Sequence, residues 1–346
     1  MMSGVPELLP FAARVLQRCA WAASSRASIN SEARSYFTYC ELASINPFPI
    51  DGYNLTLYAT WLALSGRLKS ADSIAQYISA VSVLHSERGL PCVTPTQFGP
   101  LAQVIRGFRR MAQRPVKRSH PITPPILFNL LAATPLHHPG LRVSSILTIF
   151  HAFGLLLFLS MLRSANLVPK TRSNIDWDAI LQWRNVRTIT GGVLLVIHKS
   201  KTNQFAGQPH EIPLAASPDL RFCPVTALRR LMRIYGPENC GPDSPVFRIP
   251  TSSGTWLPMI KNDYIAYFKT RISGMGLNPG DYSLHGFRAG SIQQMLLVEG
   301  NLALCKIQSG HSSDAILAYS TVPATSRLDI STRVNRRLAS NFPPIA

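Results

Sequence analysis

The sequence predicts a mainly α-helical protein with a small antiparallel β-sheet, built as an all-helical N-terminal domain followed by a mixed α+β domain. Its 346 residues suffice for about two domains, each able to bury its own core. In the first third of the chain, apolar residues recur at three- and four-residue spacing, as in amphipathic helices. The second part adds two short runs of strand-forming residues around a polar turn, which favours a β-hairpin.

Residues 1–25 are an N-terminal extension with little likeness to a secretory signal peptide. Glu7, Arg14 and Arg18 interrupt its apolar stretches. The six cysteines are scattered without a C-x-x-C pair, which suits neither a zinc site nor a disulfide framework. Together these features favour a reducing, intracellular compartment.

Residues 26–113 are expected to form a compact bundle of four or five helices. The stretches with helical periodicity are 55–68, 71–84 and 98–111. Gly and Pro residues separate these stretches and mark turns. Ser70 and Thr96 precede two of the stretches and have the residue types that cap helix N-termini.

A dense basic run, followed by prolines, indicates a linker at residues 114–125. The candidate DNA-binding cations of this region are Arg106, Arg109, Arg110, Arg114, Lys117 and Arg118. The whole chain has 35 Lys and Arg against 17 Asp and Glu, a formal net charge of +18. This excess favours a polyanionic partner, because each phosphate that is neutralised releases counterions. A solvated surface or a nuclear import signal would also explain the run.

Residues 126–346 are expected to form the mixed second domain. Helical patterns cover 126–133, 141–162, 225–235, 260–273, 284–299 and a short segment at 314–320. The two runs typical of strands are 193–198 and 211–214, joined by a polar turn at 199–210.

Residues 146–162 are almost wholly apolar, which raises the alternative of a membrane span. The stretch has 17 residues and contains Thr148, His151 and Ser160, with Arg163 directly after it. That length is about the lower limit for crossing a bilayer. A helix buried on all sides within a domain explains the stretch better, and no membrane partner is expected.

Six residues, spread over the second domain, have side chains suited to metal-free phosphodiester chemistry. They are Arg163, Lys201, His285, Arg288, His311 and Tyr319. Guanidiniums grip two phosphate oxygens at once and keep their charge. A phenol has an ordinary pKa of about 10, so its attack on phosphorus needs nearby positive charge or a base. Each residue is common by itself, and the prediction rests on the ordered set.

Two members of the set have simple structural alternatives. Arg163 directly follows an apolar stretch, so its charge needs an anionic partner. The carboxylate of a buried salt bridge would be such a partner, as a phosphate would. Lys201 lies at the predicted hairpin turn, where a lysine is usually only solvated, and Lys199 competes with it for the same role. Gly286 and Gly290 flank the His285–Arg288 pair and are expected to loosen that helix.

Five short motifs resemble those of the tyrosine recombinases, the phage-integrase-type site-specific recombinases. They are Leu-Arg-Ser-Ala-Asn-Leu-Val-Pro at 162–169, Ser-Lys-Thr-Asn-Gln-Phe at 200–205, Phe-Cys-Pro-Val at 222–225, His-Gly-Phe-Arg at 285–288, and Ser-Ser-Asp-Ala at 312–315 with Tyr319. The likeness is greatest to recombinases of eukaryotic mobile elements of the crypton and DIRS/Ngaro kinds. The motifs that carry it lie within about residues 120–335. The first domain resembles the family's core-binding domain only in its helical pattern.

The resemblance implies a role for each of the six residues. Arg163 and Arg288 would stabilise the pentacoordinate phosphate, and Lys201 would protonate the leaving 5′-hydroxyl. His285 would be the acid/base toward Tyr319, which would form a 3′-phosphotyrosine. His311 would donate to the phosphate, where many relatives carry tryptophan. The spacing from His311 to Tyr319 is eight residues, one fewer than in the bacterial and phage enzymes.

The resemblance also implies the partners of the protein. It predicts double-stranded DNA as substrate, a tetramer on DNA, a nuclear location, and no metal or other cofactor, because the cationic side chains supply the electrostatic stabilisation. Three alternatives stay open: a type IB topoisomerase-like enzyme that nicks and seals, a domesticated DNA-binding protein whose chemistry is idle, and a membrane protein built on residues 146–162.

Overall fold

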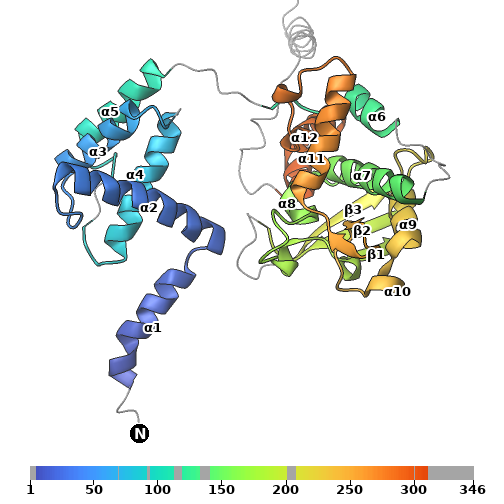
Figure 1. Ribbon diagram of the computed structural model, residues 1–346, viewed down its shortest axis with the longest axis horizontal. Helices are drawn as coiled ribbons and strands as arrows, with labels where there is room; N and C mark the ends of the chain where they lie inside the picture. The colour runs from blue at the N-terminus through green and yellow to red at the C-terminus, as the bar shows by residue number, and fades with distance from the viewer. Residues whose placement is uncertain are drawn as a thin grey trace, which may run out of the picture. The chain divides into compact units, whose positions relative to one another are not determined.

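The protein, a computed structural model, divides into two compact units, Met1–Val116 and Lys117–Ala346. The structure describes residues 5–68, 70–91, 94–112, 119–132, 141–200, 208–299 and 301–310. Figure 1 shows the helical first unit and the second unit, in which helices surround small sheets. The mainly helical fold class with small antiparallel sheets is therefore confirmed.

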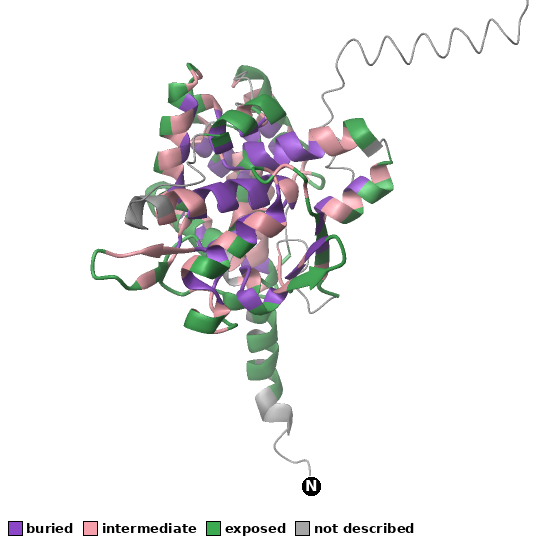
Figure 2. Cartoon of the chain, turned by 90° about the vertical axis from the view of Figure 1, so that its right-hand side faces the viewer, coloured by how far each residue is buried: buried purple, intermediate pink, exposed green. Residues whose placement is uncertain are grey.

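The first unit contains one helix with a largely exposed surface and four that share a core. These are α1 (Val5–Cys19), then α2 (Ala23–Ala43), α3 (Gly52–Leu64), α4 (Ala71–Ser86) and α5 (Gly99–Met111). Among the large side chains of the core, Tyr36 and Tyr58 are fully buried and their ring centroids lie 5.4 Å apart. On α1, Leu9, Phe11 and Leu16 are exposed, and the part of this helix that Figure 2 colours by burial has the colour of exposed residues.

One of the two predicted helix caps is confirmed. Ser70 is the N-cap of α4, and its hydroxyl accepts a hydrogen bond from the Ser73 N–H at 3.2 Å. Thr96 does not cap α5, because that helix begins at Gly99 after Phe98. The Thr96 hydroxyl instead bonds the Thr94 hydroxyl at 2.8 Å within the preceding turn.

The second unit contains eight α-helices and five strands among the described residues. The helices are α6 (Pro124–Ala132), α7 (Leu141–Leu159), α8 (Ser164–Leu167), α9 (Pro224–Tyr235), α10 (Pro237–Cys240), α11 (Lys261–Gly274), α12 (His285–Glu299) and α13 (Leu302–Ser309). The strands are β1 (Val186–Ile189), β2 (Gly192–Ile197), β3 (His210–Ala215), β4 (Arg248–Pro250) and β5 (Trp256–Pro258). Three short 3-10 helices, Trp177–Ala179, Trp183–Asn185 and Pro279–Asp281, complete it.

The predicted hairpin is present as β2 and β3, which pair antiparallel. Val193 faces Leu214 and Leu195 faces Ile212, so the apolar sides of both strands coincide. β1 adds to the other edge of β2 and was not predicted. The helix expected at 314–320 and most of the 199–210 turn lie outside the described residues.

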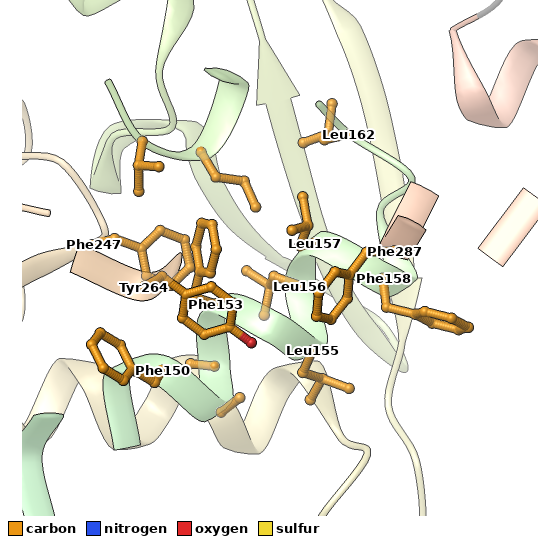
Figure 3. Packing of buried hydrophobic residues seen from close by; sticks show 14 of the residues in the cluster. Phe150, Phe153, Leu155, Leu156, Leu157, Phe158, Leu162, Phe247, Tyr264 and Phe287 are labelled. Atoms are coloured by element: carbon orange, nitrogen blue, oxygen red, sulfur yellow. The ribbon is translucent and has the colours of Figure 1, made fainter. Parts of the chain in front are cut away.

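α7 is the central helix of the second unit. Residues 149–158 are all buried, and α7 packs against α9, α12, α6 and β4. Figure 3 shows its Phe150, Phe153 and Leu156 among Phe247 and Tyr264 of other elements. The interpretation of the apolar stretch as a helix buried on all sides is confirmed. Within the described parts of the chain, no helix has both the length and the apolar composition that a membrane crossing needs.

α7 ends at Leu159, three residues before the end expected at 162. The Ser160 hydroxyl donates to the Leu156 carbonyl at 2.6 Å and accepts the Leu162 N–H at 3.3 Å, so it takes the N–H that a longer helix would bond to the Phe158 carbonyl. Met161 then has a φ of 55°, in the left-handed region, which turns the chain out of the helix. The shorter helix leaves Arg163 on a turn.

Stability of this core is expected to depend on pH through His151, a residue of α7 that is 4% exposed. Its burial, and then the positive charge of Arg230, lower the pKa of His151 from 6.5 to about 4. Below pH 6.5 the His151 side chain becomes protonated in the unfolded chain but stays neutral in the folded state. The free energy of unfolding therefore decreases as the pH falls from 6.5 toward 4. We expect a loss of about 2 kcal/mol between about pH 7.5 and about pH 5.

Urea unfolding of the wild type and His151→Leu at both pH values measures this effect. The free energy of unfolding of His151→Leu should lack the part of the pH dependence that His151 causes. An equal pH dependence in the two proteins would show that His151 does not cause it.

Candidate active site

Arg163 occupies the short connection between α7 and α8. It is the N-cap residue of α8, with extended backbone angles (φ −73°, ψ 143°) and a partly exposed side chain. The ion pairs among the described residues do not include Arg163, so they give no support to the salt-bridge alternative.

His285 and Arg288 lie on the first turn of α12, three residues apart and therefore on one side of the helix. Buried neighbours fix both arginine positions: Leu162 precedes Arg163 and is 4% exposed, and Phe287 precedes Arg288 and is fully buried. Figure 3 shows Leu162 and Phe287 in the same core as α7. The core thus positions two cationic residues that lie 125 positions apart in the sequence.

The glycines around His285 allow close packing, contrary to the expectation that they loosen α12. A Cβ on Gly286 would lie 2.5 Å from the His120 carbonyl oxygen, and one on Gly290 would lie 1.9 Å from the Ile122 carbonyl oxygen. The Ile122 N–H also donates to the Gly286 carbonyl at 2.8 Å. Residues 119–122, part of the predicted linker, therefore lie directly against the start of α12.

Arg288 is 2% exposed and connects three segments of the site. Its Nη1 donates to the carbonyl of Met161, at the end of α7, and its Nη2 donates to the carbonyl of Ser309 at 2.8 Å, at the end of α13. A guanidinium keeps its charge when buried, so these contacts hold a fixed positive charge between the turn before Arg163 and the last residue of α13.

The three described members of the predicted set lie close enough for their charges to influence one another. His285 is exposed overall, but neighbouring atoms remove part of its hydration, and this lowers the pKa of His285. The positive charges of Arg288 and then Arg163 lower that pKa further. His285 is therefore neutral at pH 7, which is the form that can accept a proton.

Asn166, which the sequence analysis did not select, joins the Arg163 turn to the hairpin. It is 5% exposed, and its Nδ2 donates to the carbonyls of Ala179 and Lys199, each at 3.2 Å. Lys199 itself forms an ion pair with Asp176 at 2.6 Å. Lys201 lies outside the described residues, so the choice between the two lysines stays a prediction.

His311 and Tyr319 also lie outside the described residues. α13 ends at Ser309, and Gly310 is its C-cap with a φ of 65°. The last described residues before His311 are thus held beside Arg288 through the Ser309 carbonyl.

His210, the first residue of β3, is a further basic group near Arg288 and was also missed. Loss of solvent first, and then the charge of Arg288, lower the pKa of His210, while a hydrogen bond to the Ile307 carbonyl opposes this. In the sequence His210 is only the last residue of the polar turn, because the residues that surround it come from α12 and α13.

The candidate DNA-binding residues are described only in α5. Arg106 and Arg110 are exposed, and Leu101 and Ile105 of the same helix are buried, so the cations face solvent. Arg109 forms an exposed ion pair with Asp72 at 2.8 Å, a type of contact that contributes little and is screened by salt. Arg114, Lys117 and Arg118 lie outside the described residues.

No family model matches this chain, and no curated protein matches it in sequence. Solved structures do match it. A Tn1549 transposon integrase in complex with transposon right end DNA has a TM-score of 0.58 at 15% identity, over 94% of this chain and 98% of that one. A lambda integrase dimer bound to a COC′ core site has a TM-score of 0.55 at 14% identity, over 92% and 95%.

A third solved structure is the XerH site-specific recombinase bound to a palindromic difH substrate. It has a TM-score of 0.54 at 13% identity, over 83% of this chain and 73% of that one. These similarities lie in the fold, which is that of the tyrosine recombinases.

Proposed function

We propose that the protein is a site-specific DNA recombinase that cuts and rejoins DNA through a 3′-phosphotyrosine at Tyr319. The observation that carries the proposal is that Arg288, on the same turn of α12 as His285, donates to the Met161 carbonyl two residues before Arg163, within a tyrosine recombinase fold. The net charge of +18 and the exposed arginines of α5 support DNA as the partner.

The charges of the site fit an in-line attack on phosphorus. Arg163 and Arg288 are permanently charged and stabilise the extra negative charge of the pentacoordinate phosphate. His285, neutral at pH 7 because its pKa is lowered, accepts the proton of the attacking Tyr319 phenol. Lys201 gives a proton to the leaving 5′-hydroxyl, and His311 donates a hydrogen bond to the phosphate. Return of a 5′-hydroxyl to the phosphotyrosine reverses these transfers and reseals the strand.

The proposal extends to the biological setting. The motifs around Arg163, Lys201 and Tyr319 support a recombinase of a eukaryotic mobile element of the crypton or DIRS/Ngaro kind, which acts in the nucleus. Exchange between two DNA sites requires four strand cleavages, so the active form is a tetramer on DNA.

Covalent capture tests the function without knowledge of the DNA site. The full chain is incubated with nicked duplexes whose sequence is randomised around the nick, and SDS-resistant adducts are isolated, sequenced and digested for mass spectrometry. We expect a nucleotide 3′-phosphate on Tyr319 and a shared sequence in the captured duplexes.

Other outcomes select the alternatives. Binding of the same duplexes without any adduct would favour a DNA-binding protein with idle chemistry. Sequence-independent adducts together with relaxation of supercoiled plasmid would favour a topoisomerase-like enzyme. An adduct on a different residue would refute the assignment of Tyr319.

A further inference from the structure

His210 holds the C-terminal end of α13 against the start of β3. Its Nε2 lies 3.1 Å from the Ile307 carbonyl oxygen. A carbonyl only accepts, so Nε2 is the protonated nitrogen of the neutral ring. The same carbonyl also accepts the Gly310 N–H at 3.2 Å, so one oxygen joins the helix end, its C-cap and the strand.

Gly310 packs directly on the His210 ring. A Cβ at Gly310 would lie 2.9 Å from the ring carbon Cε1, and its φ of 65° is in the left-handed region that favours glycine. The ring therefore lies closely against the backbone where the chain leaves α13.

Two further contacts hold the same turn. Gln308 Nε2 donates to the Pro213 carbonyl of β3 at 3.4 Å, and Arg288 Nη2 donates to the Ser309 carbonyl at 2.8 Å. The end of α13 is thus held by β3 on one side and by α12 on the other. Of the two β3 contacts, the His210 bond is the shorter, at 3.1 Å against 3.4 Å for the Gln308 bond.

We propose that His210 is a positioning residue for cleavage: by fixing the Ile307–Gly310 turn against β3, it holds in place the Ser309 carbonyl that accepts a hydrogen bond from Arg288. This inference rests on the proposed function and adds a residue to it. The same bond joins α13 to β3, so His210 connects the helix whose end contacts Arg288 with the hairpin.

Two complementary substitutions test the hydrogen bond. His210→Phe keeps a planar ring against Gly310 and removes the donor, whereas His210→Gln loses the ring and keeps an N–H donor. Single-turnover cleavage of a captured duplex, its Kd, and hydrogen exchange of the peptides covering residues 302–310 are measured for each protein.

We expect His210→Phe to cleave about tenfold more slowly, the loss of one hydrogen bond, with a Kd within about twofold of the wild type. Amide exchange of residues 302–310 should become faster. His210→Gln should return both cleavage and exchange most of the way to wild type. If His210→Phe does not fold, His210→Leu takes its place.

The proposal is overturned if His210→Phe cleaves and exchanges as the wild type does, or if His210→Gln is as impaired as His210→Phe. Absence of any adduct with the wild type would instead contradict the proposed function, and the exchange data would still decide whether His210 holds α13.

Discussion

Arg288→Lys is expected to lower the rate of DNA cleavage by about 100- to 1000-fold, the usual effect of removing one preorganised electrostatic stabiliser. Lysine keeps the charge but lacks the planar fork that reaches the Met161 and Ser309 carbonyls together. The variant therefore loses both the direction of the charge at phosphorus and the connection between the ends of α7 and α13. DNA binding should change little, because it depends on many exposed cations.

Single-turnover cleavage of a captured duplex and its Kd measure the two effects separately. Arg187→Lys is the matched control, because Arg187 is exposed on β1. The control should cleave as fast as the wild type. A similar rate for Arg288→Lys would show that Arg288 has no part in catalysis.

Periodicity predicted those elements whose buried residues recur in a regular pattern. β2 is buried at five of its six residues, and β3 alternates, so both were visible as strands. β1 exposes three of its four residues and has no such pattern. The true end of α7 depends on the Ser160 hydroxyl bond and the φ of Met161, neither of which changes the apolar pattern.

The candidate site was predicted in part, because arginine and histidine carry recognisable chemistry at Arg163, His285 and Arg288. His210 and Asn166 were missed for a different reason. Each acts through a backbone carbonyl far along the chain, at a sequence separation of 97 residues for His210 and 33 for Asn166. A carbonyl is present at every residue, so no sequence pattern identifies such partners. Only the packing of β3 on α13, and of α8 beside the hairpin, reveals them.

Gly290→Ala is expected to lower the free energy of unfolding by about 3 kcal/mol or more through overpacking. The added Cβ would lie 1.9 Å from the Ile122 carbonyl oxygen and 2.7 Å from its carbonyl carbon. Ile122 is fully buried and its N–H is bonded to Gly286, so this backbone has no space to withdraw. α12 and residues 119–122 must separate.

Gly274→Ala is the matched control for urea unfolding. Gly274 is the last residue of α11 in the same unit, and a Cβ there meets no atom within 4 Å. Both substitutions reduce the entropy of the unfolded chain equally, so Gly274→Ala should be neutral or stabilising by about 0.4–1 kcal/mol. Equal stabilities of the two variants would contradict the close contact of residues 119–122 with α12.

The cleavage rate of folded Gly290→Ala protein distinguishes a local shift of α12 from a loss of overall stability. α12 carries His285 and Arg288 on its first turn, so a shift of this helix moves both groups relative to Arg163, which belongs to the α7–α8 turn. Near-attack geometry tolerates little displacement, and about 1 Å of misplacement costs about 100-fold in rate. Protein that is still folded at low temperature should therefore cleave slowly, whereas Gly274→Ala should cleave normally. Normal cleavage by folded Gly290→Ala would mean that the close approach of residues 119–122 serves stability alone.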